Sequence, residues 1–464
     1  MKYDVIIIGG GPSGLFAAHK LAGKLKVAIF ERGKEIDKRA CPSNSSESYC
    51  YQCSPCNITS GIGGAGGLSD GKLNFINPEY SSSFSVGGDF DFINKNFLVE
   101  KMAEVDKIFL ENGASNKVYG EDREIINRLL RKANKVGIEF VPLKQKHIGS
   151  DKLPKVVKNI ENYLQERGVE IFTEEPVLDI NLKEKKIKTK KKEYQYDFLI
   201  IAVGREGAEF LERWVRKYNF SINNEVKAID VGVRVEVPAS IMNEVTSIVY
   251  DPKLRITTKK HDDHLRTFCT CPEGWVMREN YDDFCLVNGH SKAEEKTNNT
   301  NFALLGNFKF TEPFKYPNEW GRDLARLTTK LGGGNPILQR LKDLRLGRRS
   351  TESRIKSNTL VQPTLKTAIP GDISLAYPGR VIEDILDALE QLDKFLPGVA
   401  EDSTLLYAPE IKFYSLKLKV DEKMRTNIPF VYTIGDGAGI SRGIVGAAVT
   451  GLIAGEDILE VSKI

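Results

Sequence analysis

Four cysteines lie close together near the start of the chain with the spacing C-x8-C-x2-C-x2-C: Cys41, Cys50, Cys53 and Cys56. Gaps of two residues let successive sulfur atoms point toward one centre, as in iron–sulfur clusters and structural zinc sites. The pattern leaves three alternatives open. These are a [4Fe–4S] cluster, a zinc ion, and metal-free thiols or disulfides, including a redox dithiol formed by Cys53 and Cys56.

A second, shorter cysteine motif is Cys269-Thr270-Cys271. Side chains two positions apart on an extended segment point to the same face, so one of these thiols is a candidate to approach a redox centre. The alternative is a pair of small apolar core residues. Cys285, within an apolar run, is expected to be a buried strand residue.

Among the five histidines, His290 is the best candidate for a general acid or base, because it follows the short strand-like run 286–289. The alternative is a structural histidine. His261 and His264 stand in a charged turn and are expected to be solvated. Arg442 lies beside a glycine-rich loop, where an arginine can hold an anionic substrate or a cofactor.

The elements that must position these groups begin at the N-terminus. Residues 5–8 are apolar, and Gly9, Gly11 and Gly14 follow with the spacing G-x-G-x-x-G, then a predicted helix over 15–21. A second apolar run, 27–30, ends at Glu31. This order predicts a Rossmann unit that holds a dinucleotide, with the pyrophosphate at the helix N-terminus and the acid on a ribose.

Two further segments complete the nucleotide site. Residues 196–203 form an apolar strand that ends at Gly204, and residues 430–434 form another that ends in Gly435-Asp436-Gly437. A small-residue helix is predicted over 443–454. A nicotinamide Rossmann fold has no need of this last element, whereas FAD does, because its ribityl chain must also be held.

Composition excludes several classes of protein. The chain has 464 residues, 41% hydrophobic and 28% charged, with a net charge of +4, so no nucleic-acid partner is implied. No apolar run is long enough for a membrane span, and the first strand begins within four residues of Met1, so no signal peptide is expected. Seven clustered cysteines do not suit a secreted disulfide framework, and we expect a cytoplasmic protein.

The predicted fold class is α/β: a Rossmann-type domain with a parallel sheet, helices and a β-meander, and an inserted, β-rich α+β domain. A strand over 228–238, short strands within 248–310 and helices over 319–331 and 380–396 suit such an insertion. The expected boundaries are 1–210 for the nucleotide-binding domain with the Cys-rich loop 41–56, 211–415 for the inserted substrate domain, and 416–464 for the return to the first domain.

Longer strings carry a resemblance to a known family. They are residues 61–73, 266–274, 370–374, 406–415 and 435–443. With the glycine turn, they make the chain similar to the family labelled FAD-dependent dehydrogenases, or NAD(P)/FAD-dependent oxidoreductases, of undefined substrate. That family lies within the glutathione-reductase-like FAD-binding superfamily. The resemblance implies FAD and redox chemistry.

The resemblance also implies site residues. The glycines of the turn would hold the pyrophosphate, Glu31 the adenosine ribose, and Asp436 the ribityl or pyrophosphate region. Lys72 would place a cation near the flavin's pyrimidine edge; the alternative is a surface lysine. The whole cofactor-binding set implied is Gly9, Gly11, Pro12, Ser13, Gly14, Glu31, Arg32, Ala65, Gly66, Ser69, Asp70, Gly71, Lys72, Leu73, Val177, Ala202, Gly204, Gly435, Asp436 and Gly446.

The expected activity is oxidation or reduction of a small organic substrate by hydride transfer to or from FAD, with His290, Lys72 and Arg442 as catalytic candidates. A metallated cysteine cluster would connect FAD to a one-electron carrier such as ferredoxin. The glycines at 332–334 precede Pro336 and indicate a loop, so NAD(P)H is expected only as a transient donor, if at all. The alternatives are a thiol/disulfide-linked flavin reductase and a non-catalytic flavin- or lipid-binding module.

Overall fold

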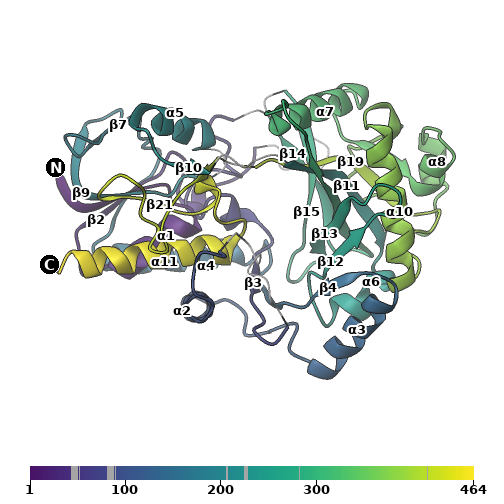
Figure 1. The fold of residues 1–464 in the computed structure, drawn as a ribbon, viewed down its shortest axis with the longest axis horizontal. Coiled ribbons are helices and arrows are strands. Elements are labelled where there is room, and N and C mark those ends of the chain that lie inside the picture. Colours follow the sequence, from purple (N-terminus) through teal and green to yellow (C-terminus); the bar gives the residue numbers. More distant parts are fainter. Residues whose placement is uncertain are drawn as a thin grey trace.

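The computed structural model describes residues 1–42, 51, 53–80, 88, 90–204, 207–223, 228–281, 283–414 and 416–463. Two sheets lie side by side along the longest axis, and both chain ends lie on the side of the first sheet (Figure 1). Helices and strands alternate in the first part, whereas strands dominate the second. The predicted α/β class with an added sheet-rich domain is confirmed.

The first sheet has the strand order β6-β2-β1-β9-β8-β7, and β21 pairs with residues 199–201 of β9, beyond the residues 193–195 that pair with β8. Strands β6, β2, β1, β9 and β21 run parallel, whereas β7 and β8 form the antiparallel hairpin expected of the meander. The strands are β1 (Lys2–Ile8), β2 (Val27–Phe30), β6 (Glu170–Phe172), β7 (Asp179–Asn181), β8 (Lys186–Lys188), β9 (Glu193–Ile201) and β21 (Val431–Thr433).

The two ends of the chain meet in a helix pair, α1 (Pro12–Leu21) and α11 (Ile444–Val461). A Cβ on Gly451 would lie 2.1 Å from the carbonyl oxygen of Ser13, so only glycine allows this approach. Helix α11 is longer than the predicted 443–454 and runs below the first sheet (Figure 1). The other helices of this half are α2 (Lys95–Glu111), α4 (Leu153–Glu166) and α5 (Ala208–Tyr218).

The second sheet has the order β18-β17-β19-β11-β16-β13-β12-β4. Its strands are β4 (Glu139–Val141), β11 (Ala228–Pro238), β12 (Lys253–Thr257), β13 (His264–Cys271), β16 (Asn299–Lys309), β17 (Ile337–Arg340), β18 (Ile369–Pro370) and β19 (Leu405–Lys412). Apolar side chains of β11 and β16 pack with those of α3, α6 and α10 in one core. Those helices are α3 (Arg123–Lys135), α6 (Ala239–Thr246) and α10 (Gly379–Phe395).

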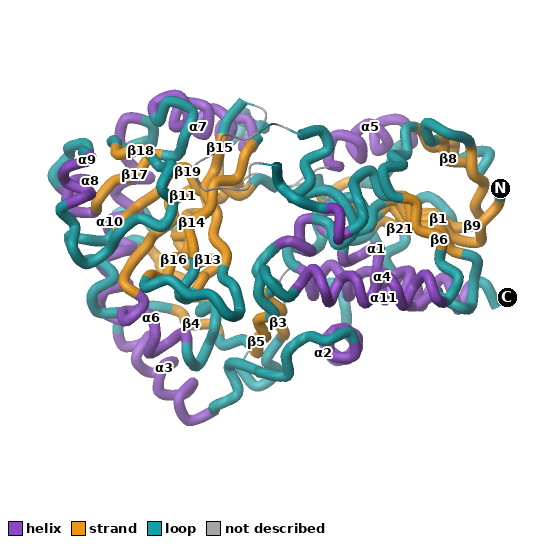
Figure 2. Tube along the Cα trace, turned by 180° about the vertical axis from the view of Figure 1, so that it is seen from behind, coloured by secondary structure: helices purple, strands orange, loops and turns teal. Residues whose placement is uncertain are grey.

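Two antiparallel ribbons complete the region between the sheets. One pairs β3 (Lys72–Phe75) with β5 (Lys144–His147), and Figure 2 shows it between the two halves of the molecule. The other pairs β14 (Trp275–Asn280) with β15 (Cys285–His290). The remaining elements are α7 (Pro317–Leu331), α8 (Leu341–Arg345), α9 (Glu352–Lys356), β10 (Ile222–Asn223) and β20 (Lys417–Leu418).

The second sheet also includes a segment from before residue 211. Strand β4 pairs with β12 at its edge, and α3 packs into the same core. The boundaries at 210 and 415 stay predictions. Among the helices of the described residues, none is both long and apolar enough to cross a bilayer.

Candidate functional site

The glycine turn between β1 and α1 has two tight positions and one open position. Gly9 has φ +111°, and a Cβ there would lie 2.5 Å from the Ala202 carbonyl oxygen; a Cβ on Gly14 would lie 2.1 Å from the Gly9 oxygen. By contrast, a Cβ on Gly11 would meet only the Cα of Gly64, at 3.9 Å. Gly9 and Gly14 therefore serve the packing of strand and helix, while Gly11 leaves space in front of the α1 N-terminus.

Glu31 joins three segments at the end of β2. It is 6% exposed, and its carboxylate accepts hydrogen bonds from the backbone N–H groups of Gly10 (2.8 Å), Gly33 (2.8 Å) and Gly61 (3.0 Å). Buried carboxylates persist in folded proteins when they are hydrogen-bonded in this way. The acid therefore fixes the glycine turn against the segment that follows the cysteine loop.

The C-terminal element closes on the same turn. A Cβ on Gly435, which has φ +76°, would lie 2.5 Å from Oγ of Ser13, and a Cβ on Gly437 would lie 1.8 Å from the Val203 oxygen. Asp436, between these glycines, accepts a hydrogen bond from Oγ of Ser441 at 3.0 Å. The structure thus brings the Asp436 loop to the mouth of the turn.

The glycine-rich segment 61–73 runs alongside. The N–H of Gly63 donates to the Gly10 oxygen at 2.8 Å, and a Cβ on Gly66 would contact Pro12 and Ile444 at 3.2 Å. Other residues of the expected cofactor set lie close to this segment or to the glycine turn. Arg32 donates to Ser60, Leu73 is buried, Gly446 is buried at the start of α11, and the segment leading to Val177 is hydrogen-bonded to Glu31.

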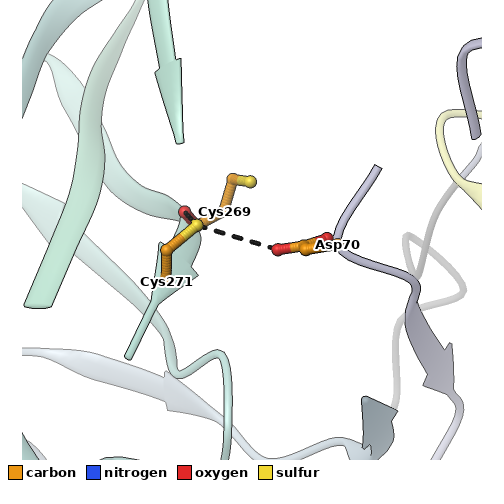
Figure 3. Close-up of side chains that lie close together, drawn as sticks. All are labelled: Asp70, Cys269 and Cys271. Atoms are coloured by element: carbon orange, nitrogen blue, oxygen red, sulfur yellow. Dashed lines mark hydrogen bonds between the residues drawn. The ribbon is translucent and has the colours of Figure 1, made fainter. Parts of the chain in front are cut away.

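Where this segment ends, a buried ion pair meets the second sheet. Nζ of Lys72 lies 2.8 Å from Oδ2 of Asp70, and 3.4 Å and 3.5 Å from Sγ of Cys269 and Cys271 on β13. Figure 3 shows Cys269 and Cys271 on one segment and the side chain of Asp70 opposite them on another, with the Cys271 thiol 3.7 Å from the carboxylate. The Lys72 side chain is only 8% exposed, so the alternative of a surface lysine is wrong.

A second cation approaches the thiols from β11. Arg234 is fully buried, and its Nη2 donates to the Cys269 carbonyl oxygen at 2.6 Å and lies 3.3 Å from Sγ of Cys271. Its Nε donates to Asn301 at 2.8 Å, and its Nη1 lies 3.6 Å from the Glu410 carboxylate. Two buried cations therefore face two sulfur atoms.

The backbone of β13 departs from regular geometry at this point. The β13–β16 register shifts between Phe268 and Cys271, and Cys269 has φ +49°, in the left-handed region that non-glycine residues rarely adopt. The sulfur atoms of Cys269 and Cys271 lie within 4.8 Å of each other and of an Asp70 oxygen. The predicted shared face is confirmed, and the bulge accompanies the pairing.

The surroundings shift the pKa values of the two thiols in opposite directions. A hydrogen bond from Cys271 lowers the pKa of Cys269 well below its usual range despite burial, and the charges of Lys72 and Arg234 act in the same direction. Burial raises the pKa of Cys271 well above its usual range, and its hydrogen bond to Cys269 adds to this. Burial tends to lower the pKa of Lys72, but Asp70 and the cysteines hold it well above the usual value. The surroundings therefore favour the thiolate form at Cys269 and the thiol form at Cys271.

A cavity of about 560 Å³ opens beside this cluster. It is lined by His147, which pairs with Lys72 across the β3–β5 ribbon, by Pro272, which follows Cys271, and by Lys117, Lys152 and Lys296. Burial lowers the pKa of His147 to about 4, and its Nε2 is buried without a hydrogen-bond partner. The volume and lining suit a small molecule.

Comparisons with known proteins agree with this geometry. Residues 3–212 match the family described as pyridine nucleotide-disulphide oxidoreductase, and residues 228–412 match a family described as FAD-dependent protein, C-terminal domain-like. The protein is an FAD-dependent oxidoreductase. The resemblance expected from the glycine motifs is confirmed. The first match covers the strands of the first sheet except β21, and the second covers those of the second sheet except β4.

Individual relatives are more distant. An uncharacterized protein of Clostridium beijerinckii is 26% identical over 99% of this chain and 81% of its own length. Glycine oxidase from Geobacillus kaustophilus aligns over 99% of this chain and 95% of its own, with 12% identity and a TM-score of 0.41. L-proline dehydrogenase from P. horikoshii aligns over 99% and 93%, with 11% identity and a TM-score of 0.40. At TM-scores below 0.5, these two structures carry no argument about the oxidoreductase.

The cysteine loop of the oxidoreductase is only partly described. Cys41, Cys53 and Cys56 are half-buried, and within this described part their sulfur atoms are not all within 4.8 Å of one another. Cys50 lies outside the described residues, so the four-cysteine site stays a prediction. Beside the loop, buried Arg39 donates to the carbonyl oxygens of Asn57, Ile58 and Ile62 at 2.6–2.9 Å and fixes the chain that leads to Gly63.

The three catalytic candidates do not share one location. Lys72 is in the buried cluster, whereas His290 is half-buried at the end of β15 with Nδ1 3.2 Å from Oγ of Ser150. Burial lowers the His290 pKa, and the charge of Asp70 opposes this. Arg442 is exposed and stacks on the Tyr414 ring at 4.0 Å.

Sequence reasoning missed His147 and Tyr250, whose rings stack at 4.3 Å beside the cluster. His147 stands in a short polar run with no motif, and only its pairing with β3 brings it to Lys72. His261 was expected to be solvated, but it is half-buried with Nδ1 2.8 Å from Asp384. A helix that packs over the β12–β13 turn provides that partner, which no local pattern reveals.

Proposed function

We propose that this FAD-dependent oxidoreductase oxidises or reduces a small organic substrate that binds in the cavity beside the Lys72 cluster. When bound, FAD supplies two-electron chemistry by accepting or donating a hydride. The observation that carries the proposal is the placement of a molecule-sized cavity next to Lys72, at the end of the glycine-rich segment that runs along the nucleotide turn.

The residues at the glycine turn fit the pyrophosphate and ribose of FAD. Gly11 leaves open space at the N-terminus of α1, where free N–H groups and the helix dipole favour an anion. Asp436 comes to the same place from the C-terminal end, as a group that holds the ribityl or pyrophosphate region must. Lys72, paired with Asp70, would stabilise negative charge on the reduced flavin.

The lining of the cavity favours an anionic substrate. Among the described residues that line the cavity, three are lysines and Glu273 is the one acid; Lys296 lies 3.8 Å from Glu273, and Lys152 lies 2.9 Å from Glu294, outside the lining. The low pKa of His147, about 4, keeps its imidazole neutral near pH 7, so this residue adds no charge to the lining. We therefore propose a small substrate that carries a carboxylate or a comparable anion.

The cysteine loop gives the proposal its second part. Four thiolates at Cys41, Cys50, Cys53 and Cys56 would hold a [4Fe–4S] cluster, which passes single electrons between FAD and a carrier such as ferredoxin. The loop leads through the segment held by Arg39 to the glycines beside the turn, which supports this route. NAD(P)H would serve only as a transient donor.

A second candidate function is a thiol/disulfide-linked flavin reductase. It was predicted with Cys53 and Cys56 as the redox dithiol, and the structure offers a different, buried pair at Cys269 and Cys271. A thiolate beside a thiol is the arrangement that thiol–disulfide exchange needs.

The test is anaerobic purification followed by a visible spectrum and iron, zinc and sulfide analysis. We expect flavin absorbance, with an added broad shoulder and stoichiometric iron and sulfide if the loop holds a cluster. NADH, NADPH, reduced ferredoxin and a dithiol are then each titrated against the flavin, and small carboxylic acids are screened as substrates. A colourless, nucleotide-free protein would refute the proposal. If only the dithiol reduces the flavin, the second candidate is favoured.

For the anion preference, Lys152→Ala and Lys296→Ala are compared with Lys107→Ala, whose side chain is 75% exposed on α2. The first two variants should raise KM for an anionic substrate severalfold, and the third should leave it unchanged. Equal KM values in all three would exclude the lysines as the anion site.

A further inference from the structure

We propose that Cys269 and Cys271 are a redox pair that closes to an intramolecular disulfide and exchanges two electrons with FAD. Formation of the disulfide needs a two-electron oxidant, which can be FAD or an added thiol oxidant, so closure of the pair can be tested without the flavin. The exchange with FAD rests on the flavin site proposed above, and the experiment below separates the two.

The geometry of β13 brings the sulfur atoms together. On a regular strand, residues two apart share a face but their side chains stand parallel, which does not favour a bond between them. Here the register shift and the positive φ of Cys269 bend the chain between the two residues, and the sulfur atoms lie within 4.8 Å. A disulfide bond is about 2.05 Å long, so closure requires the two sulfur atoms to approach each other from their present separation of no more than 4.8 Å.

The charges around the pair give each thiol a role. Cys269 is partly exposed and stands within 3.4 Å of the Lys72 ammonium, which favours the nucleophilic thiolate. Cys271 is fully buried, and its thiol lies 3.4 Å from the Cys269 carbonyl oxygen and 3.7 Å from Asp70, two acceptors that favour the protonated form. Arg234, on β11, contacts both residues, through the carbonyl oxygen of Cys269 and the sulfur atom of Cys271.

A metal ion is the competing explanation, since Asp70, Cys269 and Cys271 offer three ligand atoms within 4.8 Å of one another. The ammonium of Lys72, however, already lies 2.8–3.5 Å from all three of these residues. A divalent ion at the centre would have to displace this buried ammonium and approach Arg234 as well. The chain thus supplies its own cation, which favours redox chemistry over metal binding.

The reaction balances with FAD as the oxidant. The S–H bond of Cys271 breaks, a bond forms between the two sulfur atoms, and the pair loses two electrons and one proton. FAD takes up both electrons and the proton to give the anionic reduced form, so the single negative charge of the Cys269 thiolate passes to the cofactor. In the opposite direction, reduced FAD opens the disulfide.

The first measurement maps the thiols of the whole protein. Free thiols are alkylated under denaturing conditions, disulfides are then reduced, and the newly freed thiols receive a second label. Trypsin releases residues 267–278, which contain both cysteines, as one peptide. After treatment with a mild thiol oxidant, this peptide should carry two second labels, and after anaerobic reduction by a dithiol it should carry two first labels.

The second measurement is an anaerobic reductive titration of the FAD-loaded protein. Starting oxidised, the unmodified protein should consume two more electron equivalents per FAD than Cys269→Ser or Cys271→Ser. Cys285→Ser is the matched control, because Cys285 is also a buried strand thiol but contacts Thr329 and Gly334 instead of the cluster. It should titrate like the unmodified protein, and the cysteine loop contributes equally in all four proteins.

Each outcome of these measurements supports or overturns a stated part of the proposal. A peptide that never acquires second labels overturns the proposal, and so does stoichiometric zinc or iron that disappears in Cys269→Ser but remains in Cys285→Ser. A bound flavin with equal electron uptake in every variant overturns the exchange step alone. A disulfide in a protein that binds no flavin would refute the flavin site and leave the redox pair standing.

Discussion

Substitution of Gly11 should weaken FAD binding and leave the stability of the fold almost unchanged. Gly11 has φ −74°, which any residue adopts, and an added Cβ would meet only the Gly64 Cα at an ordinary 3.9 Å. Gly11→Ala should therefore change the free energy of unfolding of the apoprotein by no more than about 1 kcal/mol. The same methyl group occupies the space in which a pyrophosphate must approach the α1 N-terminus.

The expected loss of affinity follows from the contacts that a displaced pyrophosphate cannot make. A charge-assisted hydrogen bond contributes about 1.5–3 kcal/mol, so losing one raises the Kd for FAD roughly 10- to 150-fold. Isothermal titration of apoprotein with FAD gives the Kd, and denaturant unfolding of the same preparation gives the stability.

Two further glycines make the comparison decisive. In Gly14→Ala, the new Cβ would lie 2.1 Å from the Gly9 oxygen, so that variant should lose at least about 1–3 kcal/mol of stability as well as FAD. Gly379→Ala is the control, since nothing lies within 4 Å of its Cβ at the start of α10. If Gly11→Ala binds FAD as tightly as Gly379→Ala does, the pyrophosphate does not lie at this turn.

Three other perturbations test the structure. Lys72→Met leaves the buried Asp70 carboxylate without its partner at 2.8 Å and should cost about 3–5 kcal/mol in denaturant unfolding; a loss below about 1 kcal/mol would contradict the buried ion pair. Because the pKa of His147 falls to about 4 on folding, the unfolded state binds more protons below pH ~6.5. The protein should thus lose up to about 3 kcal/mol relative to His147→Gln as the pH falls from ~6.5 to ~4, and parallel stability curves would refute this. Gly451→Ala places a Cβ 2.1 Å from the Ser13 oxygen and should lower the melting temperature, with Gly379→Ala again as the comparison.

The nucleotide half could be predicted because its signals are local. The strand, glycine turn, helix and acid at 5–31 follow one another within a single β-α-β unit, and parallel strands place their ligand-binding ends at one edge. The segment around Asp436 is far along the chain, but its strand and small-residue helix carry a recognisable pattern. Its approach to Ser13 therefore confirmed an expectation.

The thiol cluster could be predicted only in parts. Lys72, Asp70 and the Cys269 motif were each singled out, but nothing in the sequence joins Lys72 to a residue 197 positions away. The contact between Lys72 and Cys269 depends on how the β3–β5 ribbon places the first domain against β13. The bulge at Cys269 arises from tertiary packing, which overrides the regular alternation that periodicity assumes.

The pairing of α1 with α11 has a consequence for biosynthesis. The glycine turn is synthesised early, whereas α11, which covers α1, begins only at Ile444, so the two helices cannot pair until that part of the chain has been made. Until then, the apolar side chains that α1 will bury against its late partner stay uncovered. The nascent chain must therefore keep this face of α1 free of other contacts while the residues between the two helices are synthesised.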